Sequence, residues 1–187
     1  MGVTTPTHRA IVEVERLLAR PIVAPPTELD DLVGHIIDVH HASARQWLAV
    51  LGQLVAGAEI SRLPGGSALQ RTVARVTAIL APHLAKEERV VFPYMRRLGD
   101  PAPARARFAS LAQPLRQLDD EHGAATSALA SLRRSALEMS ARAPGPEALA
   151  IFATAARAFE DDLARHLMLE DAVLFPFAQL REHRLPS

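Results

Sequence analysis

Two similar segments of the chain each place a histidine and a glutamate four residues apart. The first segment contains His83 and Glu87, and the second contains His166 and Glu170. Residues at i and i+4 share one face of an α-helix, so the imidazole and carboxylate of each pair can reach one point beside the helix. Nitrogen and oxygen donors that converge in this way suit a metal ion. The two pairs therefore predict most of a metal site.

The repetition extends beyond these pairs. The two segments agree at His, Leu, Glu, an acidic residue, Val, Phe and Pro, and both end in a Phe-Pro dipeptide. A further histidine precedes each segment at nearly the same separation, His41 before His83 and His122 before His166. The chain therefore consists of two halves, each of which supplies two histidines and one glutamate.

Six ligands of this kind fit a pair of metal ions better than a single ion. In this interpretation Glu87 and Glu170 bridge the metals, and each ion takes two of the four histidines. A His/Glu set without thiolate suits first-row metals such as iron or manganese. With only two carboxylates beside two cations, net positive charge favours an oxide or hydroxide bridge. Open positions remain for water or a small ligand.

Two alternatives explain the same residues without redox chemistry. Zinc accepts the same ligands and would give a redox-silent site. In the other alternative, the histidines are hydrogen-bonded residues in the core or at its boundary, and no metal binds. A single His-x-x-x-Glu pattern on a helix is most simply a solvated ion pair. Burying four histidines and two glutamates without metal would be costly, and this cost favours a metal site.

The other polar residues near the six are assigned different roles. His40 lies about 100° around the helix from His41, so only one of them can point into the core, and His41 is chosen as the ligand. The remaining histidines are expected to be exposed or lightly packed, and they are His8, His35 and His183. Glu88 and Asp171 are interpreted as surface or orienting groups. Asp119 and Glu121, near His122, are expected to orient an imidazole, because a metal-bound imidazole usually donates its other N–H to an acceptor.

Composition limits the class of protein. The chain has 187 residues, enough for one domain, and its 21 basic residues balance its 21 acidic ones, which disfavours nucleic acid and anionic membranes as partners. It has no cysteine, which excludes disulfides, thiolate catalysis and cysteine-ligated metals. No segment resembles a signal peptide or a membrane span, so we expect a soluble, cytoplasmic protein.

Hydrophobic periodicity predicts an all-α fold. Hydrophobic residues make up 49% of the chain but aromatic residues only 4%, a mixture that favours closely packed helices. Four long helices are expected at about 28–58, 67–98, 104–142 and 146–181, and Pro114 either kinks the third or marks its true start. Thr27 or Asp30 is available to cap the first helix.

These helices, joined by short turns, predict an up-down-up-down four-helix bundle. A short extra helix is expected at about 7–20, packed outside the bundle. The chain then divides into an N-terminal helix and linker (1–27) and a di-metal bundle (28–183). The prolines of the two Phe-Pro dipeptides, Pro93 and Pro176, fall inside helical patterns and are expected to disturb each helix about one turn beyond the predicted ligand Glu87 or Glu170.

The pattern resembles the hemerythrin-like (HHE) cation-binding domain, and more narrowly the RIC family of iron-centre repair proteins. The resemblance covers roughly residues 32–180. It is carried by these segments: His35 to His41; Leu80 to His83; Lys86, Glu87 and Glu88; Phe92-Pro93; Asp120 to His122; Asp162 to His166; Leu169 to Asp171; and Phe175-Pro176. The resemblance implies a non-haem di-iron centre with these ligands: His41, His83, Glu87, His122, His166 and Glu170.

The resemblance also implies a function. RIC proteins are associated with the response to nitric oxide and oxidative stress and with repair of iron-sulfur clusters, so the expected partners are O₂ or NO and iron-sulfur proteins. Two departures weaken this transfer: the chain lacks the cysteine-containing N-terminal domain, and Ile79 stands where relatives often have an acidic residue. The alternative is a hemerythrin-type module that binds or senses oxygen. Hemerythrins usually have five histidines and two carboxylates, and only four histidines are assigned here.

Overall fold

A computed structural model describes residues 5–98, 110–142 and 145–184 of the chain. The described part is helical and contains no strand, in agreement with the predicted all-α class. Its α-helices are α1 (Pro6–Leu18), α2 (Leu29–His35), α3 (Ala42–Ala56), α4 (Ala58–Ser61), α5 (Gly66–Lys86), α6 (Phe92–Arg97), α7 (Ala112–Arg142), α8 (Glu147–Leu169) and α9 (Phe175–His183). Three π-helical turns join some of them, namely η1 (Ile36–His41), η2 (Glu87–Val91) and η3 (Glu170–Leu174).

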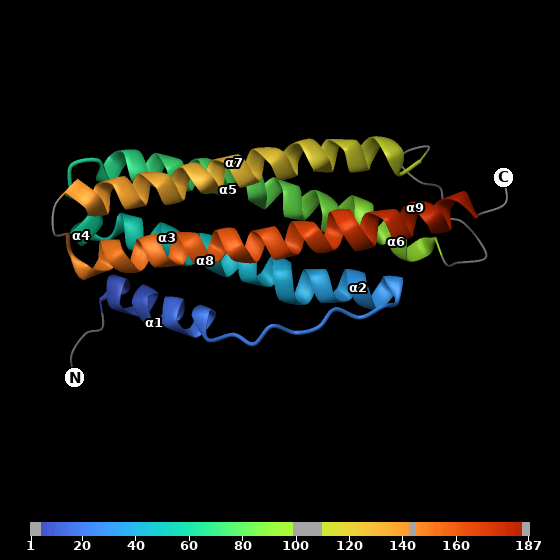
Figure 1. Ribbon diagram of the computed structural model, residues 1–187, viewed down its shortest axis with the longest axis horizontal. Helices are drawn as coiled ribbons and strands as arrows, with labels where there is room; N and C mark the ends of the chain where they lie inside the picture. Colours follow the sequence, from blue (N-terminus) through green and yellow to red (C-terminus); the bar gives the residue numbers. More distant parts are fainter. Residues whose placement is uncertain (1–4, 99–109, 143–144, 185–187) are drawn as a thin grey trace.

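The long helices lie side by side along the molecule (Figure 1). Helix α3 packs against α5 and α8, and α7 packs against the same two helices. The π-helical turns continue three of these helices without a break, because η1 leads from α2 into α3, η2 from α5 into α6, and η3 from α8 into α9. Each long helix therefore has two long neighbours and one face directed at a shared interior.

Helix α1 packs on the outside, against α3 and α8, and an extended segment of residues 19–28 connects it to α2 (Figure 1). Its start is set by Thr5, whose side chain accepts a hydrogen bond from the backbone N–H of His8, and by Pro6 in the first turn. The expected short N-terminal helix is thus present, although it begins and ends slightly earlier than predicted.

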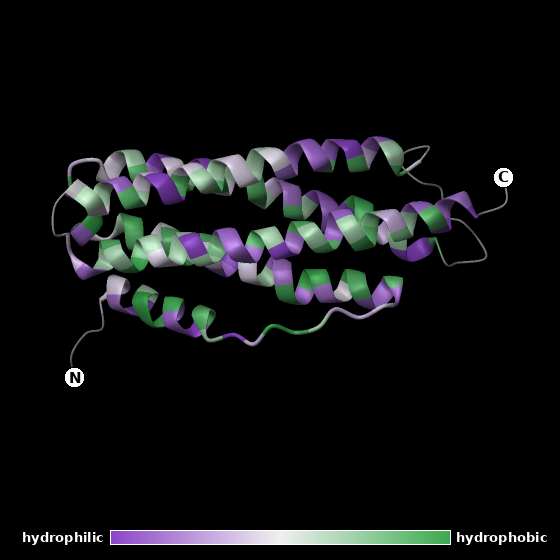
Figure 2. Cartoon of the chain, viewed as in Figure 1, coloured by the Kyte–Doolittle hydropathy of each residue, from purple (hydrophilic) through white to green (hydrophobic). Residues whose placement is uncertain are grey.

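Two hydrophobic clusters form the interior, and each long helix passes from one to the other. In α5 and η2, Leu84 belongs to the larger cluster and Val91 to the smaller one. In α8, Leu167 belongs to the larger cluster and Leu169 to the smaller one. In the chain, the predicted ligands lie near the points where the buried residues pass from one hydrophobic cluster to the other. Figure 2 shows hydrophobic and hydrophilic residues alternating along each helix, as expected for helices with one buried face.

Two of the three π-helical turns, η2 and η3, lie where the Phe-Pro dipeptides were expected to disturb the helices. The backbone N–H of Phe92 donates to the carbonyl of Glu87, five residues back, and Phe175 donates to Glu170 in the same way. A proline follows each phenylalanine and has no N–H to continue the ladder, and its ring clashes with the carbonyl four residues back. A wider turn relieves that clash, and such turns occur often at functional sites.

One detail of the helix boundaries differs from the prediction, and one agrees with a predicted alternative. The residue that precedes α2 is Glu28, and no side chain caps this helix, so the expected cap by Thr27 or Asp30 is wrong. Helix α7 begins at Ala112, so Pro114 lies in its first turn, where its missing N–H costs no hydrogen bond. The predicted start near residue 104 lies outside the described residues.

Among the described helices, none is both long enough and apolar enough to cross a membrane.

Candidate metal centre

The six predicted ligands meet in the interior, although they come from six different elements. Their side chains are His41 of η1, His83 of α5, Glu87 of η2, His122 of α7, His166 of α8 and Glu170 of η3. Each residue is at most 4% exposed. Charged and polar groups are rarely this deeply buried without partners of opposite charge or a metal ion. Their common burial therefore marks one functional cluster.

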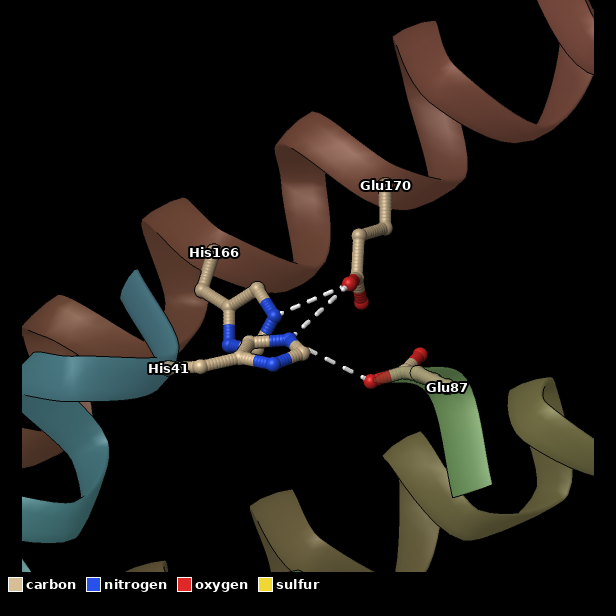
Figure 3. Close-up of side chains that lie close together, drawn as sticks. All are labelled: His41, Glu87, His166 and Glu170. Atoms are coloured by element: carbon tan, nitrogen blue, oxygen red, sulfur yellow. Dashed lines mark ion pairs between the residues drawn. The ribbon is translucent and has the colours of Figure 1, made fainter. Parts of the chain in front are cut away.

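The six side chains form two groups that could each hold a metal ion, with the ligand atoms of each group within 4.8 Å of one another. The first group consists of His41, Glu87, His166 and Glu170 (Figure 3). The second group replaces the two histidines with His83 and His122 and keeps both glutamates. A carboxylate that bridges two metal ions must belong to both groups, as Glu87 and Glu170 do.

The two oxygens of Glu170 face different groups. Its Oε1 lies 3.0 Å from Nε2 of His166, and its Oε2 lies 3.3 Å from Nε2 of His122. Glu87 also reaches both groups, because its Oε2 is 3.4 Å from Nε2 of His41 and of His83. Each carboxylate thus spans both candidate metal positions.

The histidines pair across the two halves of the sequence. Each group takes one histidine from the first half and one from the second, His41 with His166 and His83 with His122. The i, i+4 partners still contribute to the same group, since His83 joins Glu87 and His166 joins Glu170. The repeated segments therefore do not build one metal position each, and both positions depend on both halves of the chain.

The donor atoms fit a pair of metal ions. The Nε2 atoms of all four histidines and both oxygens of each glutamate are buried and lack a hydrogen-bond partner within the described part of the chain. Buried polar atoms in folded proteins almost always have a hydrogen-bond partner, so this concentration of nitrogen and oxygen atoms without one requires an explanation. Two cations bound by nitrogen and oxygen would satisfy all of them, and the donor set suits first-row metals.

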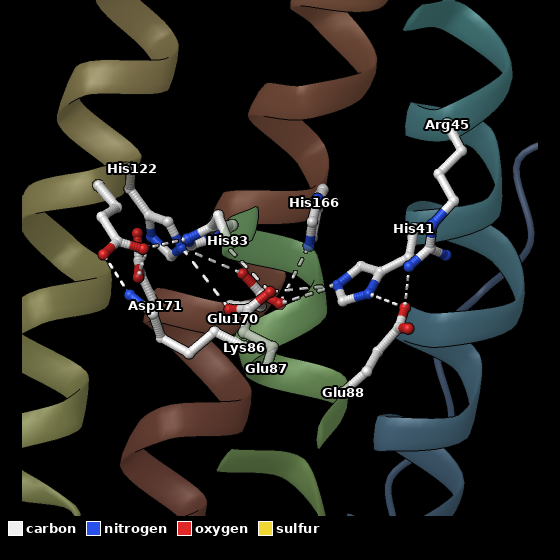
Figure 4. Close-up of polar contacts among 11 residues, drawn as sticks. His41, Arg45, His83, Lys86, Glu87, Glu88, His122, His166, Glu170 and Asp171 are labelled. Carbon is white, nitrogen blue, oxygen red and sulfur yellow. Dashed lines mark hydrogen bonds and ion pairs between the residues drawn. The ribbon is translucent and has the colours of Figure 1, made fainter. Parts of the chain in front are cut away.

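Three of the histidines are oriented by carboxylates behind them (Figure 4). Nδ1 of His41 is 2.7 Å from Oε1 of Glu88, and the same oxygen accepts a hydrogen bond of 2.6 Å from Arg45. Nδ1 of His122 is 3.1 Å from Oδ1 of Asp171. Such contacts fix the ring so that Nε2 faces the metal, and they raise its basicity.

The third carboxylate is Glu121, and the histidine that it orients is on another helix. Glu121 was expected to orient an imidazole, and it lies 3.0 Å from Nδ1 of His83 and also pairs with Lys86. Successive residues of a helix point about 100° apart, so Glu121 faces α5 while His122 faces the interior. Arg45 and Lys86, which hold the orienting carboxylates, were not identified from the sequence. Their positions, four residues after His41 and three after His83, could have indicated them.

His40 and His35 are more closely involved than expected. The structure places His41 in the cluster and leaves His40 outside it, but the His40 ring stacks on His166 with centroids 5.6 Å apart. The His35 ring meets His40 edge-on at 5.4 Å. Both rings are half-buried, because the wider turn of η1 brings them nearer the interior than an α-helix does. His8 and His183 are exposed, as expected.

Burial and neighbouring charges shift the pKa values of the metal-free cluster. Burial, followed by the charge of Glu170, raises the pKa of Glu87. Burial also opposes the ionisation of Glu170, but the surrounding histidines outweigh it and hold the pKa of this carboxyl well below its usual range. The pKa of His40 falls to about 4 because burial disfavours its charged form and His166 lies nearby. In the metal-free cluster Glu170 is therefore held as an anion, whereas burial and the charge of Glu170 oppose the ionisation of Glu87.

His41 gives the metal-free protein a pH dependence. Burial lowers its pKa, but Glu170 and Glu87 outweigh this effect and raise the pKa from 6.5 to about 9. The protonated ring therefore stabilises the fold fully below pH 6.5, and this contribution is lost as the pH rises through about 9. We expect the melting temperature of metal-free protein to fall across this range by calorimetry. The decrease should be smaller in His41→Gln, and an equal decrease in both would contradict the assignment.

The geometry defines the class of protein: an all-helical protein whose interior holds a histidine and carboxylate cluster able to bind metal cations. The family follows from comparison with known sequences, because residues 32–178 match the model of the hemerythrin HHE cation binding domain. This match covers most of the chain, which therefore belongs to that family. No curated protein matches the chain. Family and geometry agree on cation binding by buried histidine and glutamate side chains.

Proposed function

We propose that this protein is a non-haem di-iron protein with an up-down-up-down four-helix bundle. Its proposed ligands are His41, His83, Glu87, His122, His166 and Glu170. The observation that carries the proposal is that two four-residue groups share both glutamates, which gives each of two ions two histidines and two bridging carboxylates. Two iron ions satisfy this donor set, and manganese and zinc are the competing metals.

The proposed cellular role is in the response to nitric oxide or oxidative stress, including the repair of iron centres. Its support is the resemblance of the ligand-bearing segments to the RIC family, together with membership of the cation-binding family. Bound iron would supply redox chemistry with small diatomic ligands. The chain surrounds that position with hydrophobic residues on both sides and orients three of the histidines through Glu88, Glu121 and Asp171.

The test is metal analysis of protein purified with iron available, combined with optical spectra. We expect about two irons per chain and an absorption spectrum that changes on reduction and again on exposure to nitric oxide. Reversible oxygen uptake without a lasting reaction with nitric oxide would favour the alternative, an oxygen-binding or oxygen-sensing module. A protein that binds zinc alone, or no metal, when iron is supplied would refute the di-iron assignment.

A further inference from the structure

The four histidines of the cluster are not equally supported. His41, His83 and His122 each have a carboxylate oxygen within 3.1 Å of Nδ1. Nδ1 of His166 is buried and has no hydrogen-bond partner among the described residues. Figure 4 shows His166 directed at the glutamates of the centre. One metal position thus contains a histidine that no carboxylate orients.

The nearest candidate to orient His166 is already engaged. Asp162 lies one turn before His166 on α8, but its Oδ2 accepts a hydrogen bond of 2.6 Å from Ser43 and its Oδ1 one of 3.1 Å from Arg165. Instead, the ring of His40 stacks on His166, and Nδ1 of His40 is itself buried without a partner. A stacked ring does not accept a hydrogen bond in the plane of its neighbour, so it cannot fix the imidazole as a carboxylate does.

A cavity borders this side of the cluster. A cavity of about 260 Å³ lies between α1, α3, α8 and the segment of residues 19–28. Its lining includes His40, Ser43, Trp47 and Asp162. The ring that covers His166 therefore forms part of a solvent-facing wall. The His83 and His122 rings have Glu121 and Asp171 behind them, and Lys86 further holds Glu121 in place.

The carboxylates behind the other histidines are all in place. Oε1 of Glu88 lies between His41 and Arg45, and Glu121 offers Oε2 to His83 and uses Oε1 for Lys86. The contact of His41, at 2.7 Å, is the shortest of the three. The difference between the two groups therefore rests on His166, which belongs to the first group and has no carboxylate behind its ring.

We propose that the two metal positions differ in affinity, and that the ion held by His41 and His166 is the first to leave and the first to be exchanged. This inference rests on the proposed binding of two ions. Removing an outer hydrogen-bond partner of a metal ligand typically lowers metal affinity about 10- to 100-fold. The chain would then keep one ion as a structural part of the bundle and release the other, which is the behaviour suited to iron handling.

The test begins with reduced protein loaded with two irons and challenged with a ferrous chelator. We expect release in two phases of equal amplitude, with rates that differ about tenfold or more. Crystals of the half-depleted protein should show anomalous scattering from iron between His83 and His122. Iron remaining between His41 and His166, or equal loss from both positions, overturns the inference. Failure to load two irons is a different result, because it overturns the proposed function itself.

Variants then assign each phase to a position. Asp171→Asn weakens the acceptor behind His122 and should accelerate the slow phase about tenfold while leaving the fast phase unchanged. Glu88→Gln should accelerate the fast phase alone. Glu160→Gln is the matched control, because Glu160 is a carboxylate of α8 that pairs with Arg133 outside the cluster. Acceleration of the fast phase by Asp171→Asn contradicts the assignment, as does a slow-phase effect of Glu88→Gln.

Discussion

Substitution Glu170→Gln should remove most of the metal from both positions at once. The two carboxylate oxygens face different histidines, with Oε1 3.0 Å from His166 and Oε2 3.3 Å from His122. Glutamine keeps the size of the side chain but loses the charge, and its NH₂ group directs two N–H donors where a ligand needs a lone pair. Because both groups of ligands share this residue, neither position retains a complete set.

Loss of a single histidine should have a smaller effect on metal content. His122 belongs only to the second group, so His122→Ala is expected to retain about half the metal of the unaltered protein. His183→Ala is the control, since this exposed histidine of α9 lies outside the cluster. Metal content is measured by atomic spectroscopy after dialysis, and circular dichroism verifies that each variant is folded. Equal losses in Glu170→Gln and His122→Ala would show that the carboxylate does not bridge.

The sequence predicted the six residues of the buried cluster because its signal is local. His83 with Glu87, and His166 with Glu170, lie one turn apart, and helical geometry alone brings each pair together. The repetition of the pair then separated it from the many chance pairs on helix surfaces. His41 and His122 were harder to assign. They were identified because each precedes its His-x-x-x-Glu pair by nearly the same number of residues.

The pairing of the histidines could not be predicted in this way. Whether His41 shares a position with His83 or with His166 depends on the packing of α3 against both α5 and α8, and the repeat does not determine it. Which histidine Glu121 orients could not be predicted for a related reason. A residue beside a ligand in sequence points toward a different neighbour, so Glu121 supports a histidine of another helix.

The π-helical turns show a further limit of sequence periodicity. The 100° step of an α-helix predicted that His40 and His41 could not both face inward, and His35 was placed off the ligand face. A turn closed by an i to i+5 hydrogen bond has a smaller step, and η1 includes both His40 and His41. In η2 and η3, the Phe-Pro dipeptides indicated where such a turn could form, but no proline accompanies η1.

Removal of the metal should lower the thermal stability of the protein substantially. Without cations, two carboxylates and four imidazoles remain in the interior with unpaired donor atoms, and each unpaired buried group costs free energy. A ligand that binds only the folded chain at a thousand times its dissociation constant adds about 4 kcal/mol. For a domain of this size that corresponds to a rise of about 8 to 16 °C in melting temperature. Calorimetry before and after chelation measures this difference.

The double substitution Glu87→Gln and Glu170→Gln separates the cost of the buried charges from the effect of the metal. The variant keeps the volume of both buried side chains but removes their negative charges. Its melting temperature should no longer respond to added iron or zinc, whereas Glu160→Gln should respond as the unaltered protein does. A variant that is still stabilised by metal would place the binding site elsewhere. If the melting temperature of the unaltered protein does not change after verified metal removal, the hydrophobic clusters on either side of the centre hold the bundle together without the metal.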